Sequence, residues 1–364
     1  MCFPPGLREI TSPNTITFIG FAVFLIPFVL SYLVYGWDFE SEEPPGAWFS
    51  YLIAGTLFFY STFDNSDGKQ ARKTGNASTL GMLFDHGCDC LVTGALCVIT
   101  SHIFSFECKI AGIFTVVNCF SFFLKIIEQS ATGKFELGVI NPIDEGIPGA
   151  VIIFVISGMS NNLLWKNSSI VPGITWQTFF LITMVSLTII FSITSISNSV
   201  KGKGGFWVFS TMLNFLILSL SCFSVMASGL PEAWKSPKYL FLLFVVLQAR
   251  LTTGMMVTHV QGAEPNRFSF YPMLFSFLLF AISLFSFLLP EKNEILGTSY
   301  KIICLTSALC ILIRLCCLYG LSVPELRETS EGEDLYRKRA FSEKGLRILT
   351  YFCFDFQNNL VFVL

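Results

Sequence analysis

Two short stretches of the sequence carry carboxylates at the spacing of a metal site. Asp64 and Asp67 lie three residues apart, and Asp85 and Asp89 lie four residues apart. Because residues three or four apart share one face of a helix, each stretch presents a converging pair of carboxylates. Two such pairs can hold two hard divalent cations, for which oxygen ligands favour Mg²⁺, with Mn²⁺ as the second choice. We therefore predict a two-metal site that handles a diphosphate.

Three other residues near these pairs suit the same chemistry. Gly68 allows a close backbone approach, and the planar guanidinium of Arg72 suits a phosphate oxygen. His86 can accept a proton near neutral pH, which makes it the candidate base for an attacking hydroxyl. Adjacent helical residues point about 100° apart, so His86 need not be a metal ligand. The structural alternatives are an ion-pair network for the aspartates and an interhelical hydrogen bond for His86.

Composition places these residues in a membrane protein. The chain of 364 residues is 53% hydrophobic and 13% charged, against about 25% charged residues in ordinary soluble domains. A helix needs about 20 apolar residues to cross a bilayer. The sequence thus predicts an all-α polytopic membrane protein with about ten transmembrane helices, near residues 15–35, 48–63, 82–102, 110–127, 147–159, 175–196, 206–228, 239–260, 268–289 and 300–321.

The distribution of basic residues predicts the orientation of these spans. Residues 37–45 contain acids and no Lys or Arg, whereas Lys69, Arg72 and Lys73 follow the second span and are assigned to a loop. By the positive-inside rule, that loop and the candidate site face the cytosol. Residues 1–14 then form a short cytosolic segment, 15–321 the transmembrane catalytic domain and 322–364 a cytosolic tail.

Several other features narrow the function. The formal net charge of -2 argues against nucleic acid as a partner. The twelve cysteines are scattered through apolar runs without the spacing of a zinc site, so we interpret them as buried small hydrophobic residues. Asn167 begins a glycosylation sequon in a predicted lumenal loop, and its occupancy stays open. His259, near the end of the eighth span, is interpreted as an interfacial histidine.

The full acidic pattern resembles a known family signature. Asp-x-x-Asp-Gly-x-x-Ala-Arg, eight residues, then Gly-x-x-x-Asp-x-x-x-Asp is similar to the signature of the class-I CDP-alcohol phosphotransferases. Residues 67–72 and 85–89 resemble the eukaryotic choline/ethanolamine phosphotransferase branch. Pro13-Asn14-Thr15-Ile16-Thr17 and residues 139–146 resemble two further family segments, so the similarity extends over most of the membrane domain.

The resemblance implies a reaction, a fold and a set of roles. In that family the diacylglycerol hydroxyl attacks the β-phosphate of CDP-choline or CDP-ethanolamine and releases CMP. The resemblance implies a fold of ten helices that is usually dimeric. It also implies a membrane of the endoplasmic reticulum or Golgi. The roles it implies are two Mg²⁺ ions on Asp64, Asp67, Asp85 and Asp89, proton acceptance by His86 assisted by Glu145, and contact with the CDP-alcohol by Asn14, Gly68 and Arg72.

Two departures and two alternatives accompany this resemblance. Met82 stands where the branch commonly has Glu, and the segment before the first span is shorter than usual. An intramembrane prenyltransferase also uses aspartate pairs and Mg²⁺ against a diphosphate, and a cation transporter could bind its substrate ions with intramembrane acids. The sequence leaves open whether choline or ethanolamine is the headgroup, because the cage or hydrogen-bonding residues cannot be placed from it.

Overall fold

Among the described residues, ten helices of 14 or more residues correspond one to one with the ten apolar segments of the sequence. The structure is a computed structural model that describes residues 12–36, 44–133, 146–228, Leu230, Ala233, 237–260, Gly262 and 270–320. The long helices are α2 (Pro13–Leu30), α3 (Ala47–Thr74), α4 (Thr79–Ile103), α5 (Cys108–Thr132), α6 (Gly146–Met159), α8 (Trp176–Lys203), α9 (Gly205–Ala227), α11 (Lys238–Val260), α12 (Phe270–Leu288) and α13 (Asn293–Gly320). The predicted all-α architecture is therefore confirmed.

The length and composition of most of these helices fit a bilayer, whereas α3, whose last turn carries Arg72 and Lys73, is not among the candidate spans. Seven described helices are long and apolar enough to cross a membrane, and α6 and Pro272–Leu288 of α12 are shorter apolar helices. Large apolar side chains point out of the bundle, including Ile193, which is 61% exposed, and Phe287, which is 76% exposed. In water such a surface would be unfavourable, whereas contact with lipid tails satisfies it.

The second helix is longer than the sequence analysis predicted. Lys69, Arg72 and Lys73 were assigned to a loop, but α3 continues through them to Thr74. The helix ends at Gly75, which adopts φ 68° and whose N–H bonds to the carbonyl of Ala71. The assignment to a loop was wrong because apolarity was used to locate the helix end, and a helix can continue past the apolar part until a glycine stops it.

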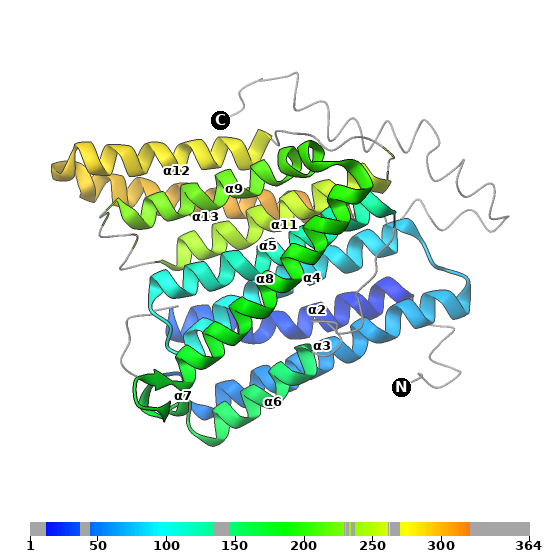
Figure 1. The fold of residues 1–364 in the computed structure, drawn as a ribbon, viewed down its shortest axis with the longest axis horizontal. Coiled ribbons are helices and arrows are strands. Elements are labelled where there is room, and N and C mark those ends of the chain that lie inside the picture. Colours follow the sequence, from blue (N-terminus) through cyan, green and yellow to red (C-terminus); the bar gives the residue numbers. More distant parts are fainter. Residues whose placement is uncertain are drawn as a thin grey trace. The chain divides into compact units, whose positions relative to one another are not determined.

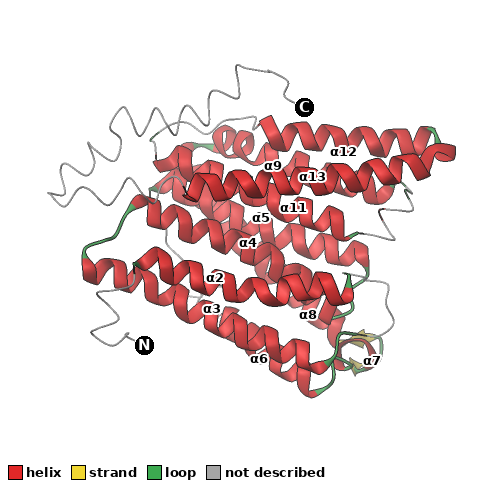
Figure 2. Ribbon diagram, turned by 180° about the vertical axis from the view of Figure 1, so that it is seen from behind, coloured by secondary structure: helices red, strands yellow, loops and turns green. Residues whose placement is uncertain are grey.

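Smaller elements and one other boundary were also missed. A π-helical turn, η1 (Ser31–Tyr35), continues α2, and a short helix α7 (Leu164–Asn167) precedes an antiparallel hairpin of β1 (Ser169–Val171) and β2 (Ile174–Thr175), drawn in yellow in Figure 2. After the 3₁₀ turn η2 (Pro290–Lys292), α13 begins at Asn293 rather than at residue 300. An acidic residue in its first turn, Glu294, favours this earlier start.

Helix α4 lies in the interior of the bundle and contacts α2, α5 and α11 (Figure 1). A Cβ added to Gly94 would lie 2.9 Å from both methyl carbons of Val245, so glycine permits the close approach of α4 to α11. One turn away, Gln248 Nε2 donates to the Cys90 carbonyl at 2.8 Å, and Cys90 Sγ donates to Gln248 Oε1 at 3.0 Å. These contacts fix the depth of α4 in the bundle.

A buried polar network joins α5 to α8. Lys125 Nζ donates to Glu128 Oε2 at 2.7 Å, and Asn198 Nδ2 of α8 donates to Glu128 Oε1 at 2.8 Å. The side chain of Glu128 is enclosed, since the residue is 5% exposed. We call Lys125, Glu128 and Asn198 the α5–α8 network. It satisfies a buried carboxylate entirely with groups of the protein.

Candidate active site

A four-residue turn brings the two acidic stretches together. It spans residues 75–78, between the end of α3 at Thr74 and the start of α4 at Thr79. Ser78 caps α4, because its hydroxyl accepts from the backbone N–H of Gly81 at 3.0 Å. The chain reverses direction at this turn, and both helices pack against α2. Each of the two helices carries one of the predicted carboxylate pairs.

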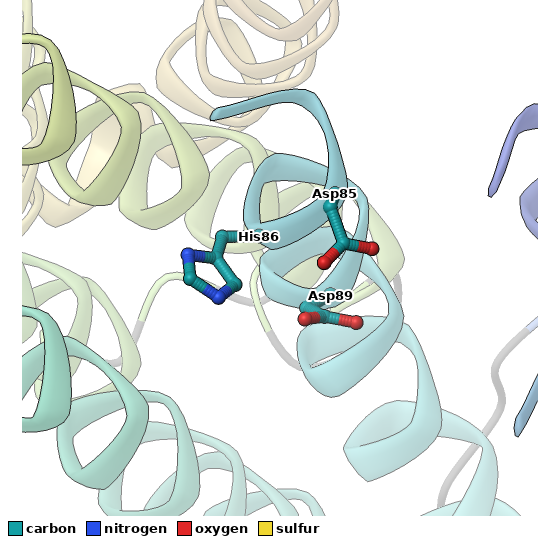
Figure 3. A group of neighbouring side chains, drawn as sticks. All are labelled: Asp85, His86 and Asp89. Atoms are coloured by element: carbon teal, nitrogen blue, oxygen red, sulfur yellow. The ribbon is translucent and has the colours of Figure 1, made fainter. Parts of the chain in front are cut away.

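The four aspartates converge across this helix junction. The side chain of Asp64 lies within interaction distance of those of Asp85 and Asp89, and the side chain of Asp67 lies within interaction distance of that of Asp85. Asp85 and Asp89 lie one turn apart on the same side of α4, as Figure 3 shows. The pairing of residues three and four apart that the spacing predicted is thus present in the structure.

The geometry and donor chemistry of this cluster fit a divalent cation. Asp64 Oδ1 and Asp85 Oδ1 are buried and have no hydrogen-bond partner among the residues that the structure describes. Buried polar atoms are rarely left without a partner, and each one costs roughly 1–3 kcal/mol. Carboxylate oxygens are the ligands that Mg²⁺ and Mn²⁺ prefer. A cation between these oxygens would supply their missing partner.

His86 occupies a different side of α4 from the two aspartates beside it. Its imidazole projects away from the carboxylates of Asp85 and Asp89 in Figure 3, and the residue is 8% exposed. One ligand atom from each of these three residues nevertheless lies within 4.8 Å of the others. The imidazole therefore lies beside the carboxylates, and its role as a proton acceptor stays a prediction.

Two hydroxyl groups that sequence reasoning missed contact the aspartates. Thr17 of α2 donates a hydrogen bond to Asp67 Oδ2, and the Tyr60 hydroxyl donates to Asp89 Oδ1 at 2.5 Å. Burial raises the pKa of Asp67, while the Thr17 hydroxyl and the Gly68 backbone amide act in the opposite direction. Thr17 ends the Pro-Asn-x-Ile-Thr segment, and Tyr60 precedes Asp64 by one helical turn, which were the available signals.

Arg72 and Gly68 lie together at the end of α3. A Cβ added to Gly68 would lie 3.4 Å from a guanidinium nitrogen of Arg72, so the arginine side chain extends back over the glycine. The Arg72 side chain is exposed and is one of the charges that act on Asp67. This position suits a guanidinium that meets a phosphate entering from outside the bundle, and phosphate binding by Arg72 stays a prediction.

Asn14 lies against the first turn of α4. A Cβ added to Gly81 would lie 3.2 Å from Asn14 Oδ1 and 3.2 Å from the Ser78 hydroxyl. Ser12 caps α2, since its hydroxyl accepts from the N–H of Thr15 at 3.3 Å. Asn14 thus lies beside the start of α4, and its contact with the CDP-alcohol, which the resemblance implies, stays a prediction.

The other residues singled out in the sequence are Glu145, His259 and Met82. Glu145 falls outside the described residues, as does most of the segment 139–146. His259 is half-buried at the end of α11. Gln129 of α5 donates from Nε2 to Met82 Sδ at 3.6 Å, so the methionine that departs from the family pattern faces α5.

Curated relatives of the chain are lipid transferases from several eukaryotes. Cholinephosphotransferase 1 of Danio rerio is 29% identical over 274 residues, which are 70% of this chain and 68% of the relative. Choline/ethanolaminephosphotransferase 1 of Arabidopsis thaliana is 28% identical over 211 residues, 53% of this chain and 52% of the relative. CDP-diacylglycerol–serine O-phosphatidyltransferase of Encephalitozoon cuniculi is 36% identical over 176 residues, which are 45% of this chain and 44% of the relative. The chain thus spans about half the length of the last two relatives.

A family model covers a larger part of the chain. The model described as CDP-alcohol phosphatidyltransferase matches residues 10–313, a range that includes both acidic stretches and nearly all of the ten helices. CDP-alcohol phosphotransferases generally depend on a divalent metal, which agrees with the donor set described above. The apolar helices and these relatives make the protein an integral membrane protein. The chain belongs to the CDP-alcohol phosphatidyltransferase family.

Proposed function

We propose that this protein transfers phosphoethanolamine or phosphocholine from the matching CDP-alcohol to diacylglycerol, in a reaction that depends on Mg²⁺. The products are phosphatidylethanolamine or phosphatidylcholine, and CMP. The observation that carries the proposal is the junction of α3 and α4, where four aspartates converge and two of their buried oxygens lack a partner among the described residues. Family membership supports the CDP-alcohol as donor.

The residues of the site divide into binding and proton-transfer roles. Two divalent cations held by Asp64, Asp67, Asp85 and Asp89 would supply neutralisation of the diphosphate and of the leaving CMP. Asn14 and Gly68 contact the CDP-alcohol, and the exposed guanidinium of Arg72 binds a phosphate oxygen, which orients the β-phosphorus.

Proton transfer falls to His86 in this proposal. The imidazole takes the proton of the diacylglycerol hydroxyl while the oxygen forms a bond to the β-phosphorus. The bond from that phosphorus to the bridging oxygen breaks, and CMP leaves with the electron pair. Glu145 is proposed as the carboxylate that assists His86, on the strength of the family resemblance alone.

The proposed setting is a membrane of the endoplasmic reticulum or Golgi, with the site on the cytosolic side. The last turns of α3 and α8 both carry basic residues, namely Arg72, Lys73, Lys201 and Lys203. Successive crossings put these two ends on the same side of the membrane, and basic residues favour the cytosolic side. We further propose residues 15–321 as the catalytic domain and a homodimer as the assembly, both from the family resemblance.

A second candidate reaction follows from the relative of Encephalitozoon cuniculi, whose name specifies CDP-diacylglycerol and serine. In that reaction the lipid is part of the donor, and a small soluble hydroxyl compound is the acceptor. The acidic cluster serves either donor, because both present a cytidine diphosphate. The two reactions differ in which substrate carries the acyl chains.

One assay separates these reactions. The purified protein in lipid nanodiscs receives Mg²⁺ and either diacylglycerol with CDP-ethanolamine, diacylglycerol with CDP-choline, or CDP-diacylglycerol with serine. We expect CMP release and the matching phospholipid, measured by mass spectrometry, with one or both CDP-amines. Product only from CDP-diacylglycerol and serine would establish the second reaction, and no CMP with any donor would refute both.

The role of His86 has its own test in the same assay. In the His86→Ala variant we expect turnover to fall by about 10²- to 10⁴-fold, the usual contribution of a general base. Binding of the CDP-alcohol, measured by equilibrium dialysis, should stay close to that of the unmodified protein. Turnover near the original value would assign the proton to another group.

A further inference from the structure

The cluster of aspartates divides into two classes by its hydrogen bonds. Asp64 and Asp85 each have a buried oxygen without a partner among the described residues. Asp67 and Asp89 each receive a side-chain hydroxyl on one oxygen. Each hydroxyl comes from the preceding helix of the chain: Thr17 of α2 serves Asp67 of α3, and Tyr60 of α3 serves Asp89 of α4.

The Tyr60 hydroxyl has little freedom to move. Tyr60 is 2% exposed, and its ring lies beside that of Phe24, with ring centroids 5.9 Å apart. Its distance of 2.5 Å to Asp89 Oδ1 is in the range of a charge-assisted O–H···O⁻ bond. This bond holds the Asp89 carboxylate in one orientation, with Oδ1 as the acceptor.

Thr17 acts on Asp67 in the same way from another helix. Both residues are buried, at 3% and 5% exposure, and the threonine hydroxyl lies between Asp67 Oδ2 and the carbonyl of Pro13, which is 3.3 Å away. Several other buried threonines of this bundle donate to a carbonyl of their own helix, as Thr115 does to Ala111 at 2.8 Å. The bond from Thr17 links α2 to the acidic stretch and fixes the orientation of the Asp67 carboxylate.

We propose that Thr17 and Tyr60 are positioning residues of the metal site, which fix the orientation of Asp67 and Asp89 and thereby raise the affinity for divalent cations. Helix α2, which supplies no carboxylate, therefore contributes to metal affinity. The inference rests on the proposed metal site, and it extends the set of residues beyond the acidic motif. Groups that hydrogen-bond to metal ligands typically contribute about 10- to 100-fold to metal affinity or activity.

The test measures binding of Mn²⁺ alone, without any CDP-alcohol. The protein in nanodiscs is titrated with Mn²⁺, and free Mn²⁺ is followed by electron paramagnetic resonance, with the thermal unfolding midpoint as a second readout. We expect Tyr60→Phe and Thr17→Val each to raise the apparent Kd about 10- to 100-fold. Thr17→Ser keeps the hydroxyl and should return the Kd to within about threefold of the original.

Matched variants separate positioning from general packing. Tyr51→Phe removes a hydroxyl from the same helix, where the Tyr51 ring lies against Gly158 of α6. Thr115→Val removes a buried hydroxyl from α5. We expect both controls to bind Mn²⁺ with unchanged affinity. Because Phe retains the ring of Tyr60, that variant tests the hydroxyl even if Thr17→Val unfolds.

Three results would overturn the inference. These are no Mn²⁺ binding by the unmodified protein, an unchanged Kd in Tyr60→Phe, or a Kd in Thr17→Ser as high as that in a folded Thr17→Val. The outcome is distinguishable from failure of the proposed function. If the Kd shifts as expected but no donor yields CMP, the positioning role stands and the reaction is wrong.

Discussion

Among the described residues, two regions of the bundle enclose carboxylates, and they differ in whether the carboxylate oxygens have hydrogen-bond partners. In the α5–α8 network, both oxygens of Glu128 receive a hydrogen bond, one from Lys125 and one from Asn198. At the junction of α3 and α4, Asp64 and Asp85 each keep a buried oxygen without a partner among the described residues. The first region is satisfied by groups of the chain itself, whereas the second has the oxygens that a bound cation would satisfy.

The difference indicates what each region is for. Transferring a carboxylate from water to the protein interior costs several kcal/mol, and an interaction with a partner group must offset this cost. The α5–α8 network offsets that cost at folding and so contributes to holding two helices together. In the aspartate cluster, hydroxyl groups offset part of that cost at Asp67 and Asp89, and the part that remains at Asp64 and Asp85 would become a driving force for cation binding.

The largest expected effect comes from removing one carboxylate of the cluster. In Asp85→Asn we expect activity to fall by more than the roughly 10- to 100-fold typical of groups that only support a metal ligand. In EDTA the thermal midpoint should stay equal or rise, because one repulsive charge has been removed. CMP release and the unfolding midpoint with and without Mg²⁺ measure the two effects. A lower midpoint in EDTA would show that Asp85 stabilises the fold by itself.

The next effect breaks the α5–α8 network. In Glu128→Ala we expect a loss of about 3–5 kcal/mol of stability, because Lys125 is left as a largely buried charge without its partner. Denaturation followed by intrinsic fluorescence checks this loss. The added stability on binding Mg²⁺ should be the same as in the unmodified protein. A reduced effect of Mg²⁺ would mean that the two regions are coupled, which contradicts the comparison.

A smaller effect is expected from the amide of the same network. In Asn198→Ala, Glu128 loses one hydrogen bond but keeps Lys125, so we expect a loss of about 1–3 kcal/mol. Measuring Lys125→Met, Asn198→Ala and the double variant gives the coupling between the two partners of Glu128. Strictly additive losses would indicate that Lys125 and Asn198 do not act through a shared carboxylate.

The sequence predicted the fold well because a bilayer demands long apolar runs. Each of the ten segments predicted from apolarity contains a helix, and the largest errors lie where polar residues continue a helix, at Lys69 to Lys73 and at Asn293. Apolarity reports where a helix crosses the membrane, and it does not report where the backbone stops being helical. Glycine and capping residues determine that end, as Gly75 and Ser78 do here.

The acidic site was predictable only in part, for a different physical reason. The convergence of the four aspartates could be predicted from their spacing, because helix periodicity and a short turn bring them together. These residues are Asp64, Asp67, Asp85 and Asp89. The bond from Thr17 to Asp67 joins residues fifty positions apart and depends on how α2 packs on α3. Likewise, nothing in the apolar run around Asn198 points to Glu128, seventy residues earlier.

The short turn between α3 and α4 would also allow the two aspartate pairs to bind the proposed cations together, as a single chelating group. With only residues 75–78 between the helices, a cation held by one pair already lies beside the other, so the second pair binds at a high effective concentration. A longer connection would keep all four carboxylates and would still lower the affinity for the cation. For the proposed metal site, the length of this turn would therefore matter as well as the carboxylates.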